Sequence, residues 1–162
     1  MTERLPAKSL PAKPPAAGPR IANPPGEPCY CGLARRASRA LTELYERELA
    51  PYGITLPQFS LMRAAAGASP LGITELALQL NLDRTTLGRN LKLLEKQGLV
   101  VFVVNQRDQR EHLVTLTRAG AKVSKEALVA WKAAQALIRR NLGKQKLAAL
   151  EQLVAQIDAL AA

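Results

Sequence analysis

The chain of 162 residues has little of several residue types: one histidine, two cysteines, and aromatic residues that make up 4% of the total. With one histidine no nucleophile–base constellation is visible, so we expect no enzyme, no catalytic residue and no cofactor. Two cysteines do not form a disulfide framework, and they fit a reducing compartment. No uncharged apolar run reaches the roughly 18 residues of a membrane span, and no secretory signal precedes the body. We therefore expect a cytoplasmic protein with no membrane partner.

Positive charge is abundant. The formal net charge is +10, while 48% of the residues are hydrophobic. This combination describes a folded protein with excess positive surface rather than a disordered polycation. The basic residues cluster around one helical segment and one hairpin, which favours nucleic acid over an anionic membrane as the partner.

The first 28 residues differ from the rest of the chain. They hold eight of the eleven prolines and almost nothing that could be buried. Because proline blocks helix propagation and favours extended conformations, residues 1–28 are predicted to be a disordered N-terminal tail.

A series of helices follows the tail. Leucines and alanines recur every three to five residues from Leu33 to Leu49, which predicts a helix that ends before Pro51. Thr55 is a predicted N-terminal cap for a second helix, which extends to about Gly67. Thr74 is the predicted cap of a short third helix that ends at Leu80. Residues 67–72, between the second and third helices, are expected to form a loop.

The segment that begins at Asp83 reads as a fourth helix, and Gly98 is its stop signal. Two apolar runs then flank the charged tip Arg107-Asp-Gln-Arg110, which predicts two short strands joined as a basic hairpin. Helix, turn, helix and basic hairpin together predict a winged helix-turn-helix over residues 54–117. The expected fold is mainly α with a small β-hairpin wing, in the α+β class.

A long helix is predicted after Thr117, with an interruption at Gly143 and apolar residues at helical spacing on both sides of it. Residues 29–53 and 118–162 carry apolar stripes with no further domain to pack on. We expect both segments to be dimerisation helices, with Trp131 in the dimer core, so the chain is predicted to form a homodimer.

Two motifs support a family resemblance. Asp108-x-Arg110 is followed by Leu116-Thr117, and Asp83-Arg-Thr-Thr runs on to a Leu-Glu-Lys-Gln-Gly-Leu-Val segment that ends at Val100. Over residues 29–162 the chain resembles MarR-family transcriptional regulators. The resemblance implies a sequence-specific DNA-binding regulator of the bacterial nucleoid, acting as a repressor and binding a pseudo-palindromic operator of double-stranded DNA as a homodimer.

The resemblance also implies that Arg110 enters a minor groove, that Asp108 orients it, and that the helix after Asp83 lies in the major groove. A guanidinium suits the negative potential of a narrow minor groove. Asp83 is expected to cap its helix, with Lys92 and Lys96 merely solvated and Leu87, Leu91 and Leu94 in the core. The expected DNA contacts are Arg84, Thr85, Thr86, Arg89, Asn90, Arg107, Asp108 and Arg110.

Cys29-Tyr-Cys31 precedes the first helix. A thiol at a helix N-terminus has its thiolate favoured, which eases oxidation or metal binding. In the organic-hydroperoxide branch of the family the reactive cysteine matches Cys31 and an assisting tyrosine matches Tyr45, but further tyrosines of that branch are replaced here by Arg35 and Leu56. Redox sensing, weak metal or metalloid binding, and cysteines that only pack all stay open.

A small aromatic or phenolic effector is the other candidate signal, bound in a pocket lined by Arg39, Tyr45 and Tyr52. Two further function classes are considered. One is a winged-helix protein-interaction module without DNA binding, which the basic residues disfavour. The other is a thiol redox protein, which the absence of a Cys-x-x-Cys motif disfavours.

Overall fold

The computed structural model of the chain describes residues 28–67, 70–105 and 112–161. The chain divides into two compact units that meet within the first helix, between Ala37 and Ser38. The predicted tail falls outside the described residues up to residue 27. The first unit contributes the opening turns of α1 (Tyr30–Leu49), which begins three residues earlier than Leu33, the first residue of the predicted helix.

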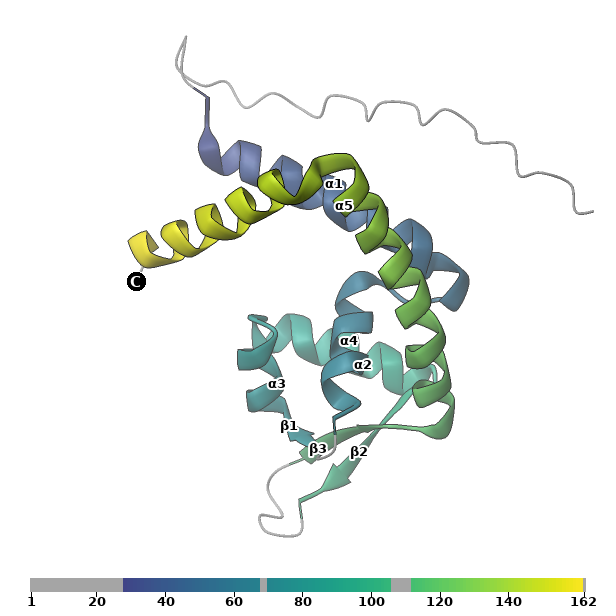
Figure 1. Ribbon diagram of the computed structural model, residues 1–162. Coiled ribbons are helices and arrows are strands. Elements are labelled where there is room, and N and C mark those ends of the chain that lie inside the picture. Colours follow the sequence, from purple (N-terminus) through teal and green to yellow (C-terminus); the bar gives the residue numbers. More distant parts are fainter. Residues whose placement is uncertain (1–27, 68–69, 106–111, 162) are drawn as a thin grey trace, which may run out of the picture. The chain divides into compact units, whose positions relative to one another are not determined.

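The second unit contains the remaining elements, which Figure 1 shows. In chain order they are η1 (Ala50–Tyr52), α2 (Leu56–Ala65), β1 (Leu71–Gly72), α3 (Ile73–Gln79), α4 (Arg84–Lys96), β2 (Val100–Val104), β3 (His112–Leu116) and α5 (Arg118–Ala161). The predicted class, a mainly helical fold with a small β-wing, is confirmed.

The N-terminus of α2 has the predicted cap. The Gln58 backbone N–H donates to the Thr55 hydroxyl at 3.5 Å, and the Thr55 backbone N–H donates to the Gln58 side-chain carbonyl at 2.9 Å. This capping box satisfies two N–H groups that a helix N-terminus leaves without partners. Pro57 in the first turn adds a φ angle suited to a helix.

The structure corrects two expectations about the next segment. Helix α3 begins at Ile73 after Gly72, so Thr74 lies inside the helix and does not cap it. The expected loop contains β1, in which Leu71 pairs with Val114. A strand of two residues is too short to show an alternating pattern, and its partner is distant in sequence, so only tertiary pairing defines it.

The wing is therefore part of a three-stranded antiparallel sheet with the order β1-β3-β2. Strands β2 and β3 pair over five residues, from Val100 opposite Leu116 to Val104 opposite His112. Helices α2, α3 and α4 lie together on one side of this sheet (Figure 1).

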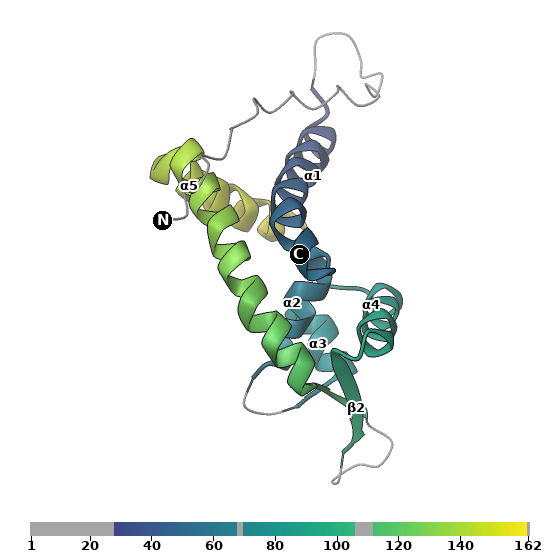
Figure 2. The same ribbon diagram turned by 90° about the vertical axis from the view of Figure 1, so that its right-hand side faces the viewer.

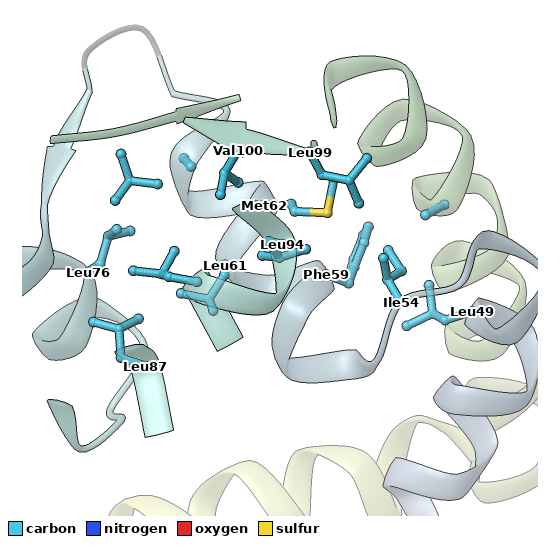
Figure 3. Close-up of a cluster of buried hydrophobic side chains, with 14 of the residues drawn as sticks. Leu49, Ile54, Phe59, Leu61, Met62, Leu76, Leu87, Leu94, Leu99 and Val100 are labelled. Atoms are coloured by element: carbon cyan, nitrogen blue, oxygen red, sulfur yellow. The ribbon is translucent and has the colours of Figure 1, made fainter. Parts of the chain in front are cut away.

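The hydrophobic core lies between these helices and the sheet (Figure 3). Leu87, Leu91 and Leu94 are at most 1% exposed, so their predicted place in the core is confirmed. Because these three residues share one face of α4, the opposite face is turned to solvent. Burial of one such leucine stabilises the fold by about 1.5–3 kcal/mol.

Helix α5 has a packed first part and an exposed last part. The first part runs beside α2 (Figure 2) and buries Ala127 and Ala134. The helix is broken at Gly143, where φ is 76° and ψ is 162°, which confirms the predicted interruption. Glycine adopts this positive φ without the steric cost that a side chain adds. After the break the apolar side chains Leu150, Leu153, Val154, Ile157 and Leu160 are exposed.

A tight junction joins the end of α4 to the start of α5. The Thr117 hydroxyl donates to the Gly98 carbonyl at 2.6 Å and accepts the Gly120 backbone N–H at 3.0 Å. The Thr117 backbone N–H donates to the Leu99 carbonyl at 3.1 Å. Gly120 is buried against Leu99, and a Cβ at this position would overlap the Leu99 carbonyl oxygen. The junction therefore fixes the base of the wing against α5.

Candidate nucleic-acid interface

The N-terminus of α4 is capped by Asp83, as predicted. One carboxylate oxygen accepts the Thr86 backbone N–H at 2.8 Å, and the other accepts the Thr86 hydroxyl at 2.6 Å. These hydrogen bonds, the side-chain bond first and the backbone bond second, lower the pKa of Asp83 from 3.8. The carboxylate is therefore charged at neutral pH and aligned with the positive end of the helix dipole.

The solvent face of α4 is basic. Thr85, Arg89, Lys92 and Lys96 are exposed and follow one another at spacings of four, three and four residues. This spacing places them on one face of the helix, away from the buried leucines. We call these four residues the basic face of α4. A helix with an exposed row of cations is the kind of element that a DNA major groove admits.

Arg84 lies beside this face and not on it. Its guanidinium donates to the Thr74 hydroxyl of α3 at 3.4 Å. This long hydrogen bond links the two helices of the helix-turn-helix. Sequence reasoning missed the role of Thr74, because a cap and a helix-to-helix contact use the same hydroxyl chemistry.

Thr86 and Asn90 are half-buried and make hydrogen bonds within the helix. The Thr86 hydroxyl donates to Asp83, and the Asn90 side-chain amide donates to the Thr86 carbonyl at 2.9 Å. The one hydroxyl proton of Thr86 is thus used by the cap, so in this arrangement Thr86 offers a phosphate no donor. Thr85 and Arg89, by contrast, point into solvent.

The predicted tip of the wing, with Arg107, Asp108 and Arg110, lies outside the described residues. The strands that carry the tip are described on both sides. His112 is exposed at the start of β3, opposite Val104 at the end of β2. The hairpin therefore exists as predicted, and the three charged residues belong to the connection between its strands.

The two cysteines differ in their surroundings within the first unit. The Gly32 backbone N–H donates to the sulfur of Cys29 at 3.4 Å, and Cys29 is half-buried. Cys31 is exposed, and neither cysteine forms a disulfide. This contact holds the Cys29 sulfur at the start of α1, which begins at Tyr30. The sequence directed attention to Cys31, whereas this contact singles out Cys29.

The aromatic candidates pack against the core of their own chain. The rings of Tyr45 and Phe59 both stack with the ring of Trp131. The centroid distance is 6.2 Å for Tyr45 and 6.3 Å for Phe59. Burial raises the pKa of Tyr45, and the charge of Arg139 partly offsets this effect. Tyr52 is also half-buried against the core, while Arg39 is exposed. The structure thus gives Trp131 two ring partners within its own chain.

In the part of the chain that the structure describes, no three histidine, cysteine or carboxylate side chains gather as metal ligands. Within the same described ranges, no helix is long and apolar enough to cross a membrane.

Comparison with known proteins gives the context of this geometry. The model of the MarR family matches residues 52–111. The regulator FarR of Neisseria gonorrhoeae, an HTH-type transcriptional regulator, is 31% identical over 122 residues, which cover 75% of this chain and 84% of FarR. The chain belongs to the MarR family.

Two further transcriptional regulators are similar to this chain, one in sequence and one in structure. The organic hydroperoxide resistance transcriptional regulator of Bacillus subtilis strain 168 is 33% identical over 98 residues, covering 60% of this chain and 67% of that protein. The structure also resembles the transcriptional regulator MosR of M. tuberculosis in complex with DNA, with a TM-score of 0.67 and 32% identity, covering 80% of this chain and 98% of MosR.

The match to the MarR family coincides with the candidate interface. Residues 52–111 contain α2, α3, α4 and β2, together with the residues of the wing tip. The basic face of α4 and the hairpin therefore lie within the family segment, and the protein is a transcriptional regulator of the MarR type.

Proposed function

We propose that this MarR-family regulator is a repressor that binds a pseudo-palindromic operator in double-stranded DNA as a homodimer and is released by an effector. The observation that carries the proposal is the basic face of α4, which stands opposite the buried leucines and is free of the packing that holds α4 in the domain. The protein acts by binding rather than by catalysis, and we expect it on chromosomal DNA in the bacterial cytoplasm.

On DNA, α4 lies in the major groove and the hairpin tip reaches the adjacent minor groove. Arg89 and Thr85 contact base edges or phosphates, and Arg84 contacts a phosphate once it leaves Thr74. Asn90 and Thr86 are weaker contacts because their donors serve the helix. Arg110, oriented by Asp108, and Arg107 supply the wing contacts, in agreement with the attraction of arginine to a narrow minor groove.

Exposed apolar residues lie in both helical segments outside the winged domain. The last turns of α5 expose a row of apolar residues that includes Leu153 and Ile157, and Tyr30 and Leu33 are exposed in the first turns of α1. An exposed row of large apolar side chains on a helix marks an interaction site. We therefore assign residues 29–53 and 118–162 to dimerisation and residues 54–117 to DNA binding. Two copies of α4 then read two half-sites about one helical turn apart.

The experiment is a fluorescence anisotropy titration of the full chain on the DNA upstream of its own gene. Arg89→Ala and Arg110→Ala are expected to weaken binding by about 1–3 kcal/mol each. Lys132→Ala removes an exposed charge from the first part of α5, away from the DNA contacts and from the exposed apolar residues after Gly143, and should leave affinity unchanged. Equal DNA affinities for Arg89→Ala, Arg110→Ala and the parent would contradict the proposed interface. Failure of the parent protein to bind this DNA would favour a protein-interaction module.

A second element of the proposal is a thiol switch, supported by the contact between the Gly32 N–H and the sulfur of Cys29. The thiolate of Cys29 attacks a hydroperoxide and forms a sulfenic acid with release of an alcohol or water. Cys31 then condenses with it to a disulfide and releases water. Oxidation is expected to release DNA, and loss of the response in Cys29→Ser tests the switch.

A small aromatic or phenolic effector is the alternative signal. Arg39, Tyr45 and Tyr52 are its proposed contacts, although both tyrosines pack against the core. Release of DNA by a phenolic acid under reducing conditions, with no effect of peroxide, would support this signal in place of the cysteines.

A further inference from the structure

The C-terminal end of α4 is closed by backbone hydrogen bonds that continue past the helix. The Gly98 N–H donates to the Glu95 carbonyl at 2.8 Å. The Leu99 N–H donates to the Leu94 carbonyl at 2.9 Å. This pair of bonds is the Schellman motif, which fixes the two residues after a helix against its last turn. Any group that holds Gly98 or Leu99 therefore also holds the end of α4.

Thr117 holds both of these residues from the start of α5. Its hydroxyl donates to the Gly98 carbonyl at 2.6 Å, and its backbone N–H donates to the Leu99 carbonyl at 3.1 Å. The same hydroxyl oxygen accepts the Gly120 N–H at 3.0 Å, which caps α5. The hydroxyl therefore has two separable roles, because its oxygen caps α5 and its proton bonds the end of α4.

A second side chain joins the same end of α4 to a distant part of the chain. The Gln97 side-chain amide donates to the Gly53 carbonyl at 3.3 Å, across 44 residues of sequence. Gly53 directly follows η1, and η1 directly follows α1. The end of α4 is thus bonded to the segment that follows α1 and, through Thr117, to the start of α5.

These contacts lie at the borders between the DNA-binding segment and the two segments assigned above to dimerisation. Gly53 is the last residue of the segment 29–53, and Thr117 immediately precedes the segment 118–162. The buried leucines of α4 hold it in the domain, but apolar contacts have no preferred direction, whereas hydrogen bonds do. The contacts of Gln97 and Thr117 are therefore directional links between α4 and the dimerisation segments.

We propose that Gln97 and Thr117 are positioning residues that set the direction of α4 relative to the dimerisation helices. In a homodimer this direction fixes the distance between the two copies of α4, and with it the spacing of the two half-sites that the protein accepts. The inference rests on the proposed mode of DNA binding. It assigns to these two side chains the selection between operators of different spacing, a role that needs no contact with DNA.

The test compares the spacing preference of the full-length parent and its variants by fluorescence anisotropy. The probe is the duplex upstream of the protein's own gene, trimmed to the region that the protein protects from nuclease. Two further duplexes have one base pair inserted or deleted at the centre, which rotates one half-site by about a tenth of a helical turn. The parent is expected to bind both altered duplexes at least about tenfold more weakly than the natural one.

Two variants remove one contact each. Thr117→Asp keeps an acceptor for the cap of α5 but, as a carboxylate, has no proton for the Gly98 carbonyl. Gln97→Met keeps the length of the side chain and removes the amide. Because one hydrogen bond corresponds to about a factor of five, each variant should reduce the preference for the natural spacing to about twofold.

Two controls keep the contacts. Thr117→Ser retains both the oxygen and the proton of the hydroxyl, so it should show the spacing preference of the parent. Ala119→Asp adds the same charge as Thr117→Asp at an exposed residue of the first turn of α5, and it should also show the preference of the parent. Circular dichroism checks that each variant is folded, and Gln97→Met decides the test if Thr117→Asp is not.

An unchanged spacing preference in either folded variant would overturn the inference, which requires both contacts. A parent that binds the three duplexes equally, or variants that bind all three more weakly by the same factor, would also overturn it, since a loss of stability alone has the latter effect. Arg89→Ala separates this inference from the proposed function. It should weaken binding to every duplex about tenfold without changing the preference, and its retained affinity would contradict the DNA interface itself.

Discussion

Replacement of Gly120 by alanine tests the junction between the wing and α5. A Cβ at residue 120 would overlap the Leu99 carbonyl oxygen and would lie 2.8 Å from the Leu99 carbonyl carbon. Both neighbours are backbone atoms, so no side-chain rotation relieves the overlap and one of the two segments must move. Overpacking of this kind costs about 1–3 kcal/mol, and occasionally more.

The movement also threatens the hydrogen bonds of Thr117. Its backbone N–H donates to Leu99 and its hydroxyl joins Gly98 to Gly120. A hydrogen bond contributes about 1 kcal/mol, and the higher helix propensity of alanine returns about 1 kcal/mol. When the movement breaks two of these hydrogen bonds, the net loss for Gly120→Ala is about 2–4 kcal/mol, a large share of the 5–15 kcal/mol that is typical of a folded domain.

The assay is urea unfolding at one fixed protein concentration, because dimerisation would make stability depend on concentration. The matched control is Gly88→Ala in α4, where a Cβ would have no atom within 4 Å apart from its chain neighbours and the backbone of its own helix. That exchange should stabilise the protein by about 0.5–1 kcal/mol, since glycine is a poor helix former. A Gly120→Ala protein as stable as the parent would refute the reasoning about the junction.

Three further predictions concern the cap, the thiols and the dimer. Asp83→Ala should destabilise the protein at neutral pH. Because folding lowers the pKa of Asp83 below 3.8, the stability that this carboxylate contributes is present above about pH 4 and is lost as the pH falls through the folded-state pKa. Equal acid unfolding curves for the parent and the variant would contradict this. Cys29→Ser should abolish the formation of sulfenic acid with a hydroperoxide, whereas Cys31→Ser should let the sulfenic acid accumulate. Mass spectrometry of the two oxidised variants distinguishes these outcomes. The reverse pattern would assign the attacking thiol to Cys31. Ile157→Lys should convert a dimer to a monomer in sedimentation analysis with the far-UV circular dichroism of the winged domain retained, and an unchanged dimer would remove the end of α5 from the interface.

Features of the fold that depend on local chemistry could be predicted from the sequence. Thr55 and Asp83 cap their helices as expected, because a cap needs only a side-chain acceptor and the residues of the next turn. Gly143 interrupts α5 as expected, because glycine tolerates a positive φ. The three buried leucines of α4 follow from helical spacing, and the basic face follows from them.

Features that depend on partners distant in sequence could not be predicted. Strand β1 exists only through its pairing with β3, and Thr74 contacts Arg84 rather than capping α3. The burial of Ser124 in α5 could not be predicted either, because a serine in a helix is as compatible with solvent as with the interior. The DNA contacts assigned to Arg107, Asp108 and Arg110 stay predictions that rest on the motif and the charge of the tip.

DNA binding through the basic face of α4 is the central claim, and the salt dependence of affinity tests it most directly. Neutralisation of phosphates by cations releases counterions, so the logarithm of the affinity should fall steeply and linearly with the logarithm of salt concentration. Removal of a phosphate contact by Arg84→Ala or Arg89→Ala should reduce that slope by about one each, while Lys132→Ala should leave it unchanged. Binding that is insensitive to salt, or a slope that these two variants on α4 do not change, would contradict the claim.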